Sequence, residues 1–231
     1  MELSKRLGFI AKHIDKCESI IDVGTDHGYI PIYAVKNGLC SRAIASDINR
    51  EPVKKAKLNV SLEGVSDEVE VRLGGGLETV NKGEVESVVI AGMGGNLIRD
   101  ILESDKSKVP FYKFLILQPA QNPEVLREYL YTSGYEIIAE DLCYDEGIYY
   151  ELFKVKKGID KPNIMEPIFY EISPVLLKEK HPLMFDYLSI KEEKYNKILG
   201  FIKDDTESAK KRKEELEMKI KEIEGFKEEV K

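Results

Sequence analysis

One short stretch near the N-terminus constrains the fold of this chain more than any other. An apolar run at 19–23 leads into Gly24 and Gly28, and apolar residues at helical spacing follow from Ile30. This order predicts a strand, a tight turn and a helix, because glycines permit backbone conformations that side chains hinder. The turn also sets backbone N–H groups at a helix N-terminus, where they can hold a polar or anionic ligand. The stretch is typical of the first strand and helix of a doubly wound α/β sheet.

Such a turn also occurs in α/β proteins that bind no ligand. Two features favour a ligand site here. The spacing from Asp22 to Gly28 is Asp-x-Gly-x-Asp-x-Gly, which differs from the Gly-x-Gly-x-x-Gly of dinucleotide-binding enzymes. Asp47 follows the turn by about 20 residues, at the end of the next predicted strand, where it could accept hydrogen bonds from ribose hydroxyls.

Length and composition limit the remaining classes. The 231 residues suffice for one large domain or for one domain with an appendage. We expect neither a membrane span nor a secretory signal, because no apolar run reaches the ~20 residues that cross a bilayer. Cys17, Cys40 and Cys143 stand far apart, which indicates reduced thiols in the cytoplasm and no zinc site. The net charge of −7 argues against indiscriminate nucleic-acid binding, but it allows a local basic face.

Strand and helix patterns alternate along the first 133 residues. After the run at 19–23, strands are predicted at 43–47, 69–73, 87–91 and 114–117. Two further strands, 135–142 and 148–155, are joined by a turn without a helix between them. The pattern therefore predicts a seven-stranded sheet whose last hairpin is antiparallel. This order is typical of class I S-adenosylmethionine-dependent methyltransferases, an α/β, Rossmann-like fold.

The segment 156–162 predicts a domain boundary, with a cofactor-binding domain at 1–158 and a helical region at 159–231. Apolar residues in this region recur at spacings near 3, 4 and 7, and residues 204–206 offer a cap between two helices. We therefore expect an antiparallel, coiled-coil-like helical hairpin that closes within the chain.

Two basic clusters allow two interpretations each. Lys5 and Arg6 lie on the polar side of an amphipathic first helix. A concentrated basic patch stands in the C-terminal region, at Lys210, Lys211, Arg212 and Lys213. Each cluster is either an ordinary solvated face or a surface that contacts a polyanion.

Three blocks of sequence then point to one family. These are Asp22-Val23-Gly24-Thr25-Asp26-His27-Gly28-Tyr29-Ile30-Pro31, Ala91-Gly92-Met93-Gly94-Gly95 and Leu117-Gln118-Pro119. In content and order they resemble the bacterial tRNA (adenine(22)-N1)-methyltransferases, the TrmK family, over nearly the whole chain. The resemblance implies transfer of a methyl group from S-adenosylmethionine to N1 of adenine 22 in tRNA.

The resemblance also implies a cofactor site. Gly24, Asp26 and Gly28 would surround the methionine part, and Asp47 would bind the ribose. The residues expected beside the transferable methyl are Ala91, Gly92 and Met93. The other expected cofactor residues are Asp22, Thr25, Ile48, Gly75, Gly76 and Leu77.

One position departs from the family pattern. Relatives commonly carry an acid where this chain has Gly75, and that acid would accept a hydrogen bond from the cofactor adenine. Backbone groups, packing against Leu77 or another acceptor must replace it here. We therefore expect weaker cofactor binding.

The implied catalytic residues are Asp26, His27, Tyr29, Gln118 and Pro119. Adenine N1 carries a lone pair and no proton, so alignment and electrostatics should supply most of the rate. Asp26 either stabilises the cationic product or only binds the cofactor. His27 and Tyr29 either position the target base or stabilise the turn and the core. Gln118 could bond to the base edge, and Pro119 would shape the pocket.

The expected partner is tRNA, gripped by Lys5, Arg6 and the C-terminal basic patch, and the expected state is a cytoplasmic monomer without metal. Two alternatives remain open at this point. One is a methyltransferase for a different RNA or for a small molecule, because the cofactor fold does not determine the substrate. The other is a non-catalytic module that binds RNA or a nucleotide.

Overall fold

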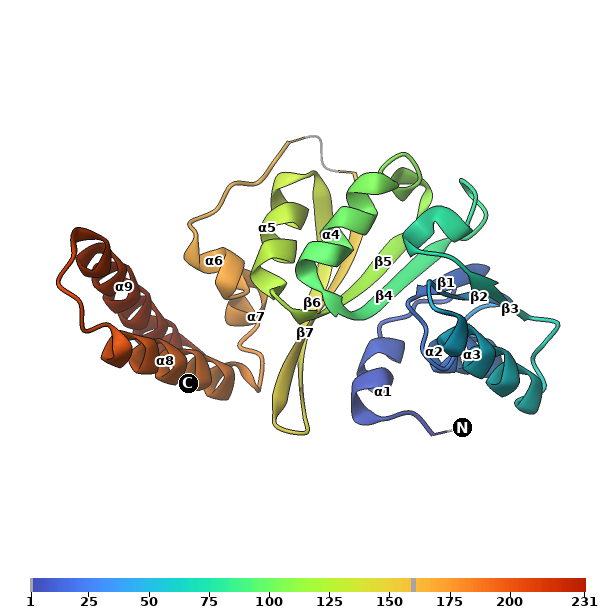
Figure 1. Cartoon of the computed structure of the whole chain (residues 1–231), viewed down its shortest axis with the longest axis horizontal. Helices are drawn as coiled ribbons and strands as arrows, with labels where there is room; N and C mark the ends of the chain where they lie inside the picture. The colour runs from blue at the N-terminus through green and yellow to red at the C-terminus, as the bar shows by residue number, and fades with distance from the viewer. Residues whose placement is uncertain (1, 159–160) are drawn as a thin grey trace. The chain divides into compact units, whose positions relative to one another are not determined.

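The computed structural model describes residues 2–158 and 161–231, and Figure 1 shows the course of the chain. The chain forms two compact units, Met1–Met165 and Glu166–Lys231. The predicted domain boundary after residue 158 falls at Ile159 and Asp160, which lie outside the described residues. That boundary stays a prediction.

The first unit is built on one seven-stranded sheet in the order β3-β2-β1-β4-β5-β7-β6 (Figure 1). Its strands are β1 (Ser19–Val23), β2 (Arg42–Asp47), β3 (Val69–Leu73), β4 (Ser87–Gly94), β5 (Phe114–Gln121), β6 (Tyr135–Asp145) and β7 (Ile148–Lys157). The first five strands pair in parallel, and β7 pairs antiparallel with both β5 and β6. The predicted class I methyltransferase fold, with its reversed last hairpin, is confirmed.

Helices cover both faces of this sheet. They are α1 (Lys5–Ala11), α2 (Tyr29–Lys36), α3 (Arg50–Leu62), α4 (Gly95–Ser104) and α5 (Pro123–Thr132), with short 3-10 helices η1 (Gly76–Thr79) and η2 (Val109–Phe111). Neighbouring strand residues enter opposite cores: Ile20 and Val89 belong to one, and Ile21 and Val88 to the other. A sheet buried on both faces explains why its strands appear in the sequence as continuous apolar runs.

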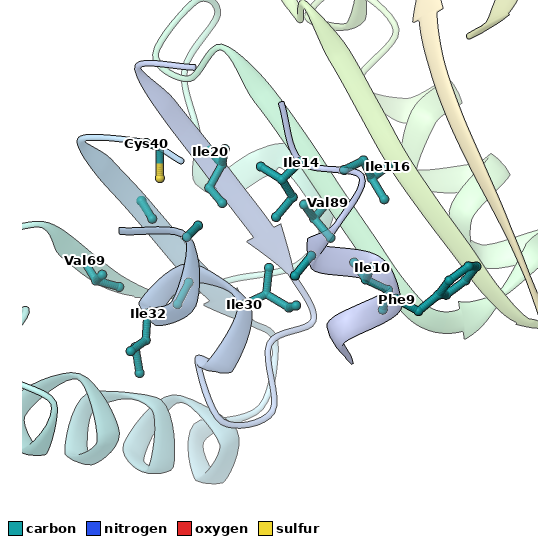
Figure 2. Packing of buried hydrophobic residues seen from close by; sticks show 14 of the residues in the cluster. Phe9, Ile10, Ile14, Ile20, Ile30, Ile32, Cys40, Val69, Val89 and Ile116 are labelled. Atoms are coloured by element: carbon teal, nitrogen blue, oxygen red, sulfur yellow. The ribbon is translucent and has the colours of Figure 1, made fainter. Parts of the chain in front are cut away.

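Figure 2 shows the core on the face covered by α1 and α2. Ile10 of α1 and Ile30 of α2 pack there with Ile20, Val89 and Ile116 of the strands. This packing ties α1 and α2 to the central strands, whose carboxyl ends carry the motifs identified in the sequence.

Four strands, β4, β5, β6 and β7, run further than the sequence predicts. β4 and β5 continue to Gly94 and Gln121, because Met93 pairs with Pro119 and Gly94 with Gln121 across two irregularities in the register. Such bulges bend a strand and re-aim its side chains next to active sites. The first helix is shorter than its apolar pattern: it begins after Ser4, whose hydroxyl accepts a hydrogen bond from the Leu7 N–H.

The second unit consists of helices. They are α6 (Ile168–Glu171), α7 (Pro174–Lys178), α8 (Met184–Phe201) and α9 (Glu207–Val230). Thr206 caps α9 by accepting the Ala209 N–H at 3.2 Å. Lys231, at the end of α9, lies over the ring of Phe185, at the start of α8, so the two helices are antiparallel. They form the expected helical hairpin.

Candidate functional site: two pockets at the carboxyl ends of the strands

The turn after β1 carries the candidate site residues of the first motif. Gly24 and Gly28 both adopt left-handed backbone conformations, with φ of +78° and +73°. A Cβ atom on Gly24 would also collide with the end of the Met93 side chain. The Thr25 hydroxyl accepts the Gly28 N–H at 3.1 Å and closes the turn. The left-handed backbone of the turn therefore favours glycine at 24, whereas the Met93 methyl, at the end of a flexible side chain, could move away from a Cβ.

A pocket of about 180 Å³ opens at this turn. It is lined by Arg6, Leu7, Asp22, Gly24, Thr25, Asp26, His27, Tyr29, Ile30 and Ala91. Its walls combine a guanidinium with carboxylates, so they complement a ligand that carries both an ammonium and a carboxylate.

Asp22 is the buried acid of this pocket, with 7% of its surface exposed. The pKa of Asp22 is raised to about 6, chiefly by burial and to a smaller extent by the Asp47 charge, while the Thr25 hydroxyl and the Arg6 charge oppose the shift. An ammonium group in the pocket would favour the ionised form of Asp22.

Arg6 reaches from α1 across the pocket to the ends of β4 and β5. Its Nη1 donates to the Gln118 Oε1 at 2.7 Å, and its backbone N–H donates to Asp145 at 3.1 Å. A Cβ on Gly92 would lie 3.4 Å from the guanidinium, so Arg6 packs closely over that glycine. The Arg6 guanidinium thus lines the pocket, and the expected contact of Arg6 with RNA stays a prediction.

Gln118 is completely buried. Its amide oxygen accepts from Arg6, and its amide nitrogen donates to the Pro119 carbonyl at 2.7 Å. A bond from Gln118 to the target base would use the second lone pair of the amide oxygen or the second N–H of the amide nitrogen. The expected base contact of Gln118 stays a prediction.

Asp26, His27 and Tyr29 form a chain of contacts on the pocket wall. The Asp26 carboxylate lies 3.1 Å from His27 Nε2 and 3.5 Å from Lys55 Nζ of α3. The rings of His27 and Tyr29 are stacked, with centroids 5.0 Å apart and planes inclined by 11°. The Asn59 amide donates to the His27 carbonyl at 2.9 Å and fixes the turn to α3. The three expected catalytic side chains of this motif are thus brought together.

A second pocket, of about 320 Å³, lies at the ends of β2 and β3. It is lined by Ile48, Gly75, Gly76, Glu78, Leu97, Asp100, Ile101, Ser104 and Asp105. Asp47 ends β2, and its Oδ1 accepts the Asn49 N–H at 2.7 Å. Its Oδ2 accepts no hydrogen bond from any residue that the structure describes, so it remains available to a hydroxyl.

Two residues of η1, Leu77 and Glu78, bear on the expectations for the cofactor adenine. Leu77 is completely buried in the core and lines neither pocket, because η1 turns its side chain under the sheet. Ile48, Leu97 and Ile101 supply the apolar wall instead. Glu78 was missed: its carboxylate accepts the Gly75 N–H at 2.7 Å. An acid three residues after the cap is a sequence signal for that contact.

The other expected RNA-binding residues are exposed. Lys5 is exposed on α1, and Lys210, Lys211 and Arg212 are exposed on α9, with Lys213 half-buried. Lys210 pairs with Asp205 at 3.3 Å and Arg212 with Glu215 at 3.4 Å, so part of the patch is neutralised within the second unit.

Comparison with known proteins now decides the family. Residues 20–225 match the family model described as "TrmK: tRNA (adenine(22)-N(1))-methyltransferase". The chain belongs to the TrmK family. It is 39% identical over 185 residues to the tRNA (adenine(22)-N(1))-methyltransferase of Bacillus subtilis, covering 78% of this chain and 77% of that protein.

Solved structures of TrmK proteins share the whole fold. A putative tRNA (m1A22) methyltransferase of Streptococcus pneumoniae, in complex with S-adenosyl-L-methionine, superposes with a TM-score of 0.86 at 30% identity, covering 98% of this chain and 100% of that one. TrmK of M. capricolum, in complex with S-adenosyl-homocysteine, superposes with a TM-score of 0.85 at 30% identity and covers both chains completely.

S-adenosylmethionine is the cofactor of this TrmK chain, and the two pockets fit its parts. The Arg6–Asp22 pocket suits an amino-acid zwitterion, and the free Oδ2 of Asp47 suits a ribose hydroxyl. The second pocket combines aliphatic walls with a carboxylate, which suits adenine. In the described residues, no cluster of three or more His, Cys, Asp or Glu side chains is arranged to hold a metal ion.

Proposed function

We propose that this TrmK chain transfers a methyl group from S-adenosylmethionine to N1 of adenine 22 in tRNA. One observation supports the proposal most strongly. The pocket whose charges suit a zwitterion is also lined by Asp26, His27 and Tyr29, which contact one another at the end of β1. The family motifs and the geometry therefore point to the same residues.

Within this proposal, Arg6 and Asp22 hold the methionine part of the cofactor. The Arg6 guanidinium pairs with the carboxylate and Asp22 pairs with the ammonium, as charge-assisted hydrogen bonds. Asp47 accepts from the ribose, and the close approach of Met93 over Gly24 shapes the wall beside the methyl group.

When bound, S-adenosylmethionine supplies a methyl group that its sulfonium has already activated. The protein then has to position the adenine and stabilise the positive charge that the ring gains. Asp26 supplies that negative charge, and Lys55 and His27 hold its carboxylate in place. The stacked rings of His27 and Tyr29 offer a flat surface for the target base.

A cationic helix flanks the pocket. Among the helices of the described residues, α3 carries the largest excess of positive charge, with Arg50, Lys54, Lys55 and Lys57 against Glu51 alone. All four cations are exposed, and neither Arg50 nor Lys57 has an ion pair within the described part of the chain. We propose that α3 contacts the tRNA backbone beside the target adenine.

We propose that Lys5 of α1 contacts tRNA as well, and that Lys210–Lys213 do so on the second unit. A polyanion that meets cations on several elements can be oriented as well as bound. We further propose that the protein acts as a monomer in the cytoplasm, because α8 and α9 bury Leu216 and Ile223 within the second unit. No helix of the described residues combines the length and apolar character needed to cross a membrane.

Incubation of the purified protein with total bacterial tRNA and methyl-labelled S-adenosylmethionine tests the function. Nucleoside analysis of the digested tRNA should find the label in 1-methyladenosine. Label in another nucleoside, or none in tRNA, would reject the proposal.

A further inference from the structure

We infer that Glu78 recognises the adenine of S-adenosylmethionine by accepting a hydrogen bond from its exocyclic amino group. The inference rests on the proposed function in one respect, the identity of the cofactor. It assigns the acceptor that the glycine at position 75 does not provide.

The walls of the second pocket suit a flat heterocycle. Ile48 and Leu97 are 70% and 52% exposed there, and Ile101 lines the same pocket. Large aliphatic side chains left open in a pocket gain from a ligand that covers them. An adenine ring has two apolar faces, and its polar groups lie at its edge.

Three acids line this pocket, and two of them are engaged elsewhere. Asp100 pairs with Arg99 at 2.8 Å, and Asp105 pairs with Lys108 at 2.7 Å. Glu78 has no ion pair with any described residue. The Glu78 carboxylate is therefore available to a hydrogen-bond donor of a ligand, whereas the charges of Asp100 and Asp105 are largely balanced by their ion-pair partners.

The Glu78 carboxylate is also held in position. Its Oε1 accepts the Gly75 N–H at 2.7 Å, which fixes the carboxylate at the beginning of η1. Its Oε2 accepts no hydrogen bond from the described residues, and an ionised carboxylate oxygen can accept more than one. The cap thus orients the group, and the second oxygen remains for the amino group of adenine.

Glu78 and a side chain at position 75 compete for the same space. A Cβ on Gly75 would lie 3.3 Å from Glu78 Oε1 and 3.3 Å from Ile48 Cδ1. Gly75 has φ of −97°, so its backbone would accept any residue. An acid at 75 would bring a second carboxylate against Glu78, and the two would repel. Either position can provide the acceptor, and an acid at both positions would force the two carboxylates apart.

Calorimetry with two ligands tests this inference. The first is S-adenosylhomocysteine, and the second is its purine analogue, in which hydrogen replaces the amino group. The proteins are the parent chain, Glu78→Ala, Gly75→Asp, the double variant, and Asp100→Asn as a control in the same pocket. The ratio of the two dissociation constants is independent of how much of each sample is folded.

The parent should prefer S-adenosylhomocysteine by about ten-fold, as expected of a hydrogen bond to a charged acceptor. Glu78→Ala should reduce that preference to at most about two-fold, and adding Gly75→Asp should restore it. Gly75→Asp alone should weaken both ligands, and Asp100→Asn should keep the parent's preference.

A ten-fold preference that persists in Glu78→Ala, or that is lost in Asp100→Asn, would overturn the assignment of Glu78. A parent chain without any preference would overturn it as well. A parent chain that binds neither ligand would instead reject the cofactor itself, and with it the proposed function.

Discussion

At the scale of single residues, the burial of Asp22 in the proposed cofactor pocket lowers the stability of the folded chain. Burial raises the pKa of Asp22 to about 6, from a usual value of 3.8, so its ionised form is disfavoured in the folded chain. At neutral pH this shift lowers the free energy of unfolding by at most about 3 kcal/mol. This destabilisation is absent below the pKa of Asp22 in the unfolded chain and develops as the pH rises through the pKa of Asp22 in the folded chain.

Asp22→Asn should therefore raise the free energy of unfolding at neutral pH, by up to about 3 kcal/mol. The same change should weaken cofactor binding. Urea denaturation and calorimetry with S-adenosylhomocysteine measure the two effects. For the parent, affinity should fall roughly ten-fold from about pH 7 to about pH 5, since protonated Asp22 cannot pair with an ammonium. Affinity that is flat over this range would contradict the role of Asp22.

Arg6 was expected on an RNA-binding surface, and its place in the pocket changes the prediction for it. Arg6→Met should weaken S-adenosylmethionine by about ten-fold or more, because a buried carboxylate would lose its guanidinium partner. It should leave methylthioadenosine, which has no carboxylate, unaffected. Arg6→Lys should recover part of the loss. Equal losses for both ligands would show that Arg6 acts on the pocket and not on the carboxylate.

At the scale of elements, the sequence predicts the alternating strands, the reversed hairpin and the two C-terminal helices, because periodicity reports burial directly. It misses what depends on distant contacts. Arg6 joins Gln118 across 112 positions, and the pairing of β4 with β5 extends through irregular registers. The bond from the Gly75 N–H to Glu78 could have been predicted, because the two residues are three positions apart. The pocket that they line could not, because its other walls come from distant parts of the sequence.

The cations of α3 predict an effect confined to tRNA. Lys54→Gln with Lys57→Gln should raise the KM for tRNA by about ten-fold and reduce the salt dependence of binding by about two counterions. The kcat and the affinity for S-adenosylhomocysteine should change little.

Lys82→Gln with Lys106→Gln provides the matched control. Both lysines are exposed, and both lie in connections that lead into β4 and β5, at the amino ends of the strands. This pair should leave the KM for tRNA unchanged. Equal effects of the two pairs would mean that net charge, and not the α3 surface, determines binding. If the α3 pair leaves the KM for tRNA unchanged but weakens the binding of a protein partner, α3 binds that partner and not tRNA.

At the scale of the whole molecule, a chain with a net charge of −7 has to bind a polyanion. The local excess on α3 and the patch on α9 make this feasible, since screening limits the reach of distant charges to roughly 8–10 Å. The two units each have buried residues of their own, and the two pockets proposed for the cofactor lie entirely in the first.

A chain ended after Met165 should therefore keep its affinity for S-adenosylhomocysteine and lose nearly all tRNA methylation. Calorimetry shows whether the shortened chain is folded, and methyl incorporation shows what it has lost. Normal turnover of tRNA by a shortened chain that binds the cofactor would remove the second unit from substrate recognition.

The most direct test of the account uses two transcripts of one tRNA, one with adenine and one with guanine at position 22. Methylation at N1 blocks Watson–Crick pairing, so reverse transcription stops at a modified adenine. Methylation of adenine 22 by this chain predicts a stop at position 22 that requires the protein, S-adenosylmethionine and adenine at that position. A stop at another adenine, or a stop that persists with guanine at position 22, would contradict it.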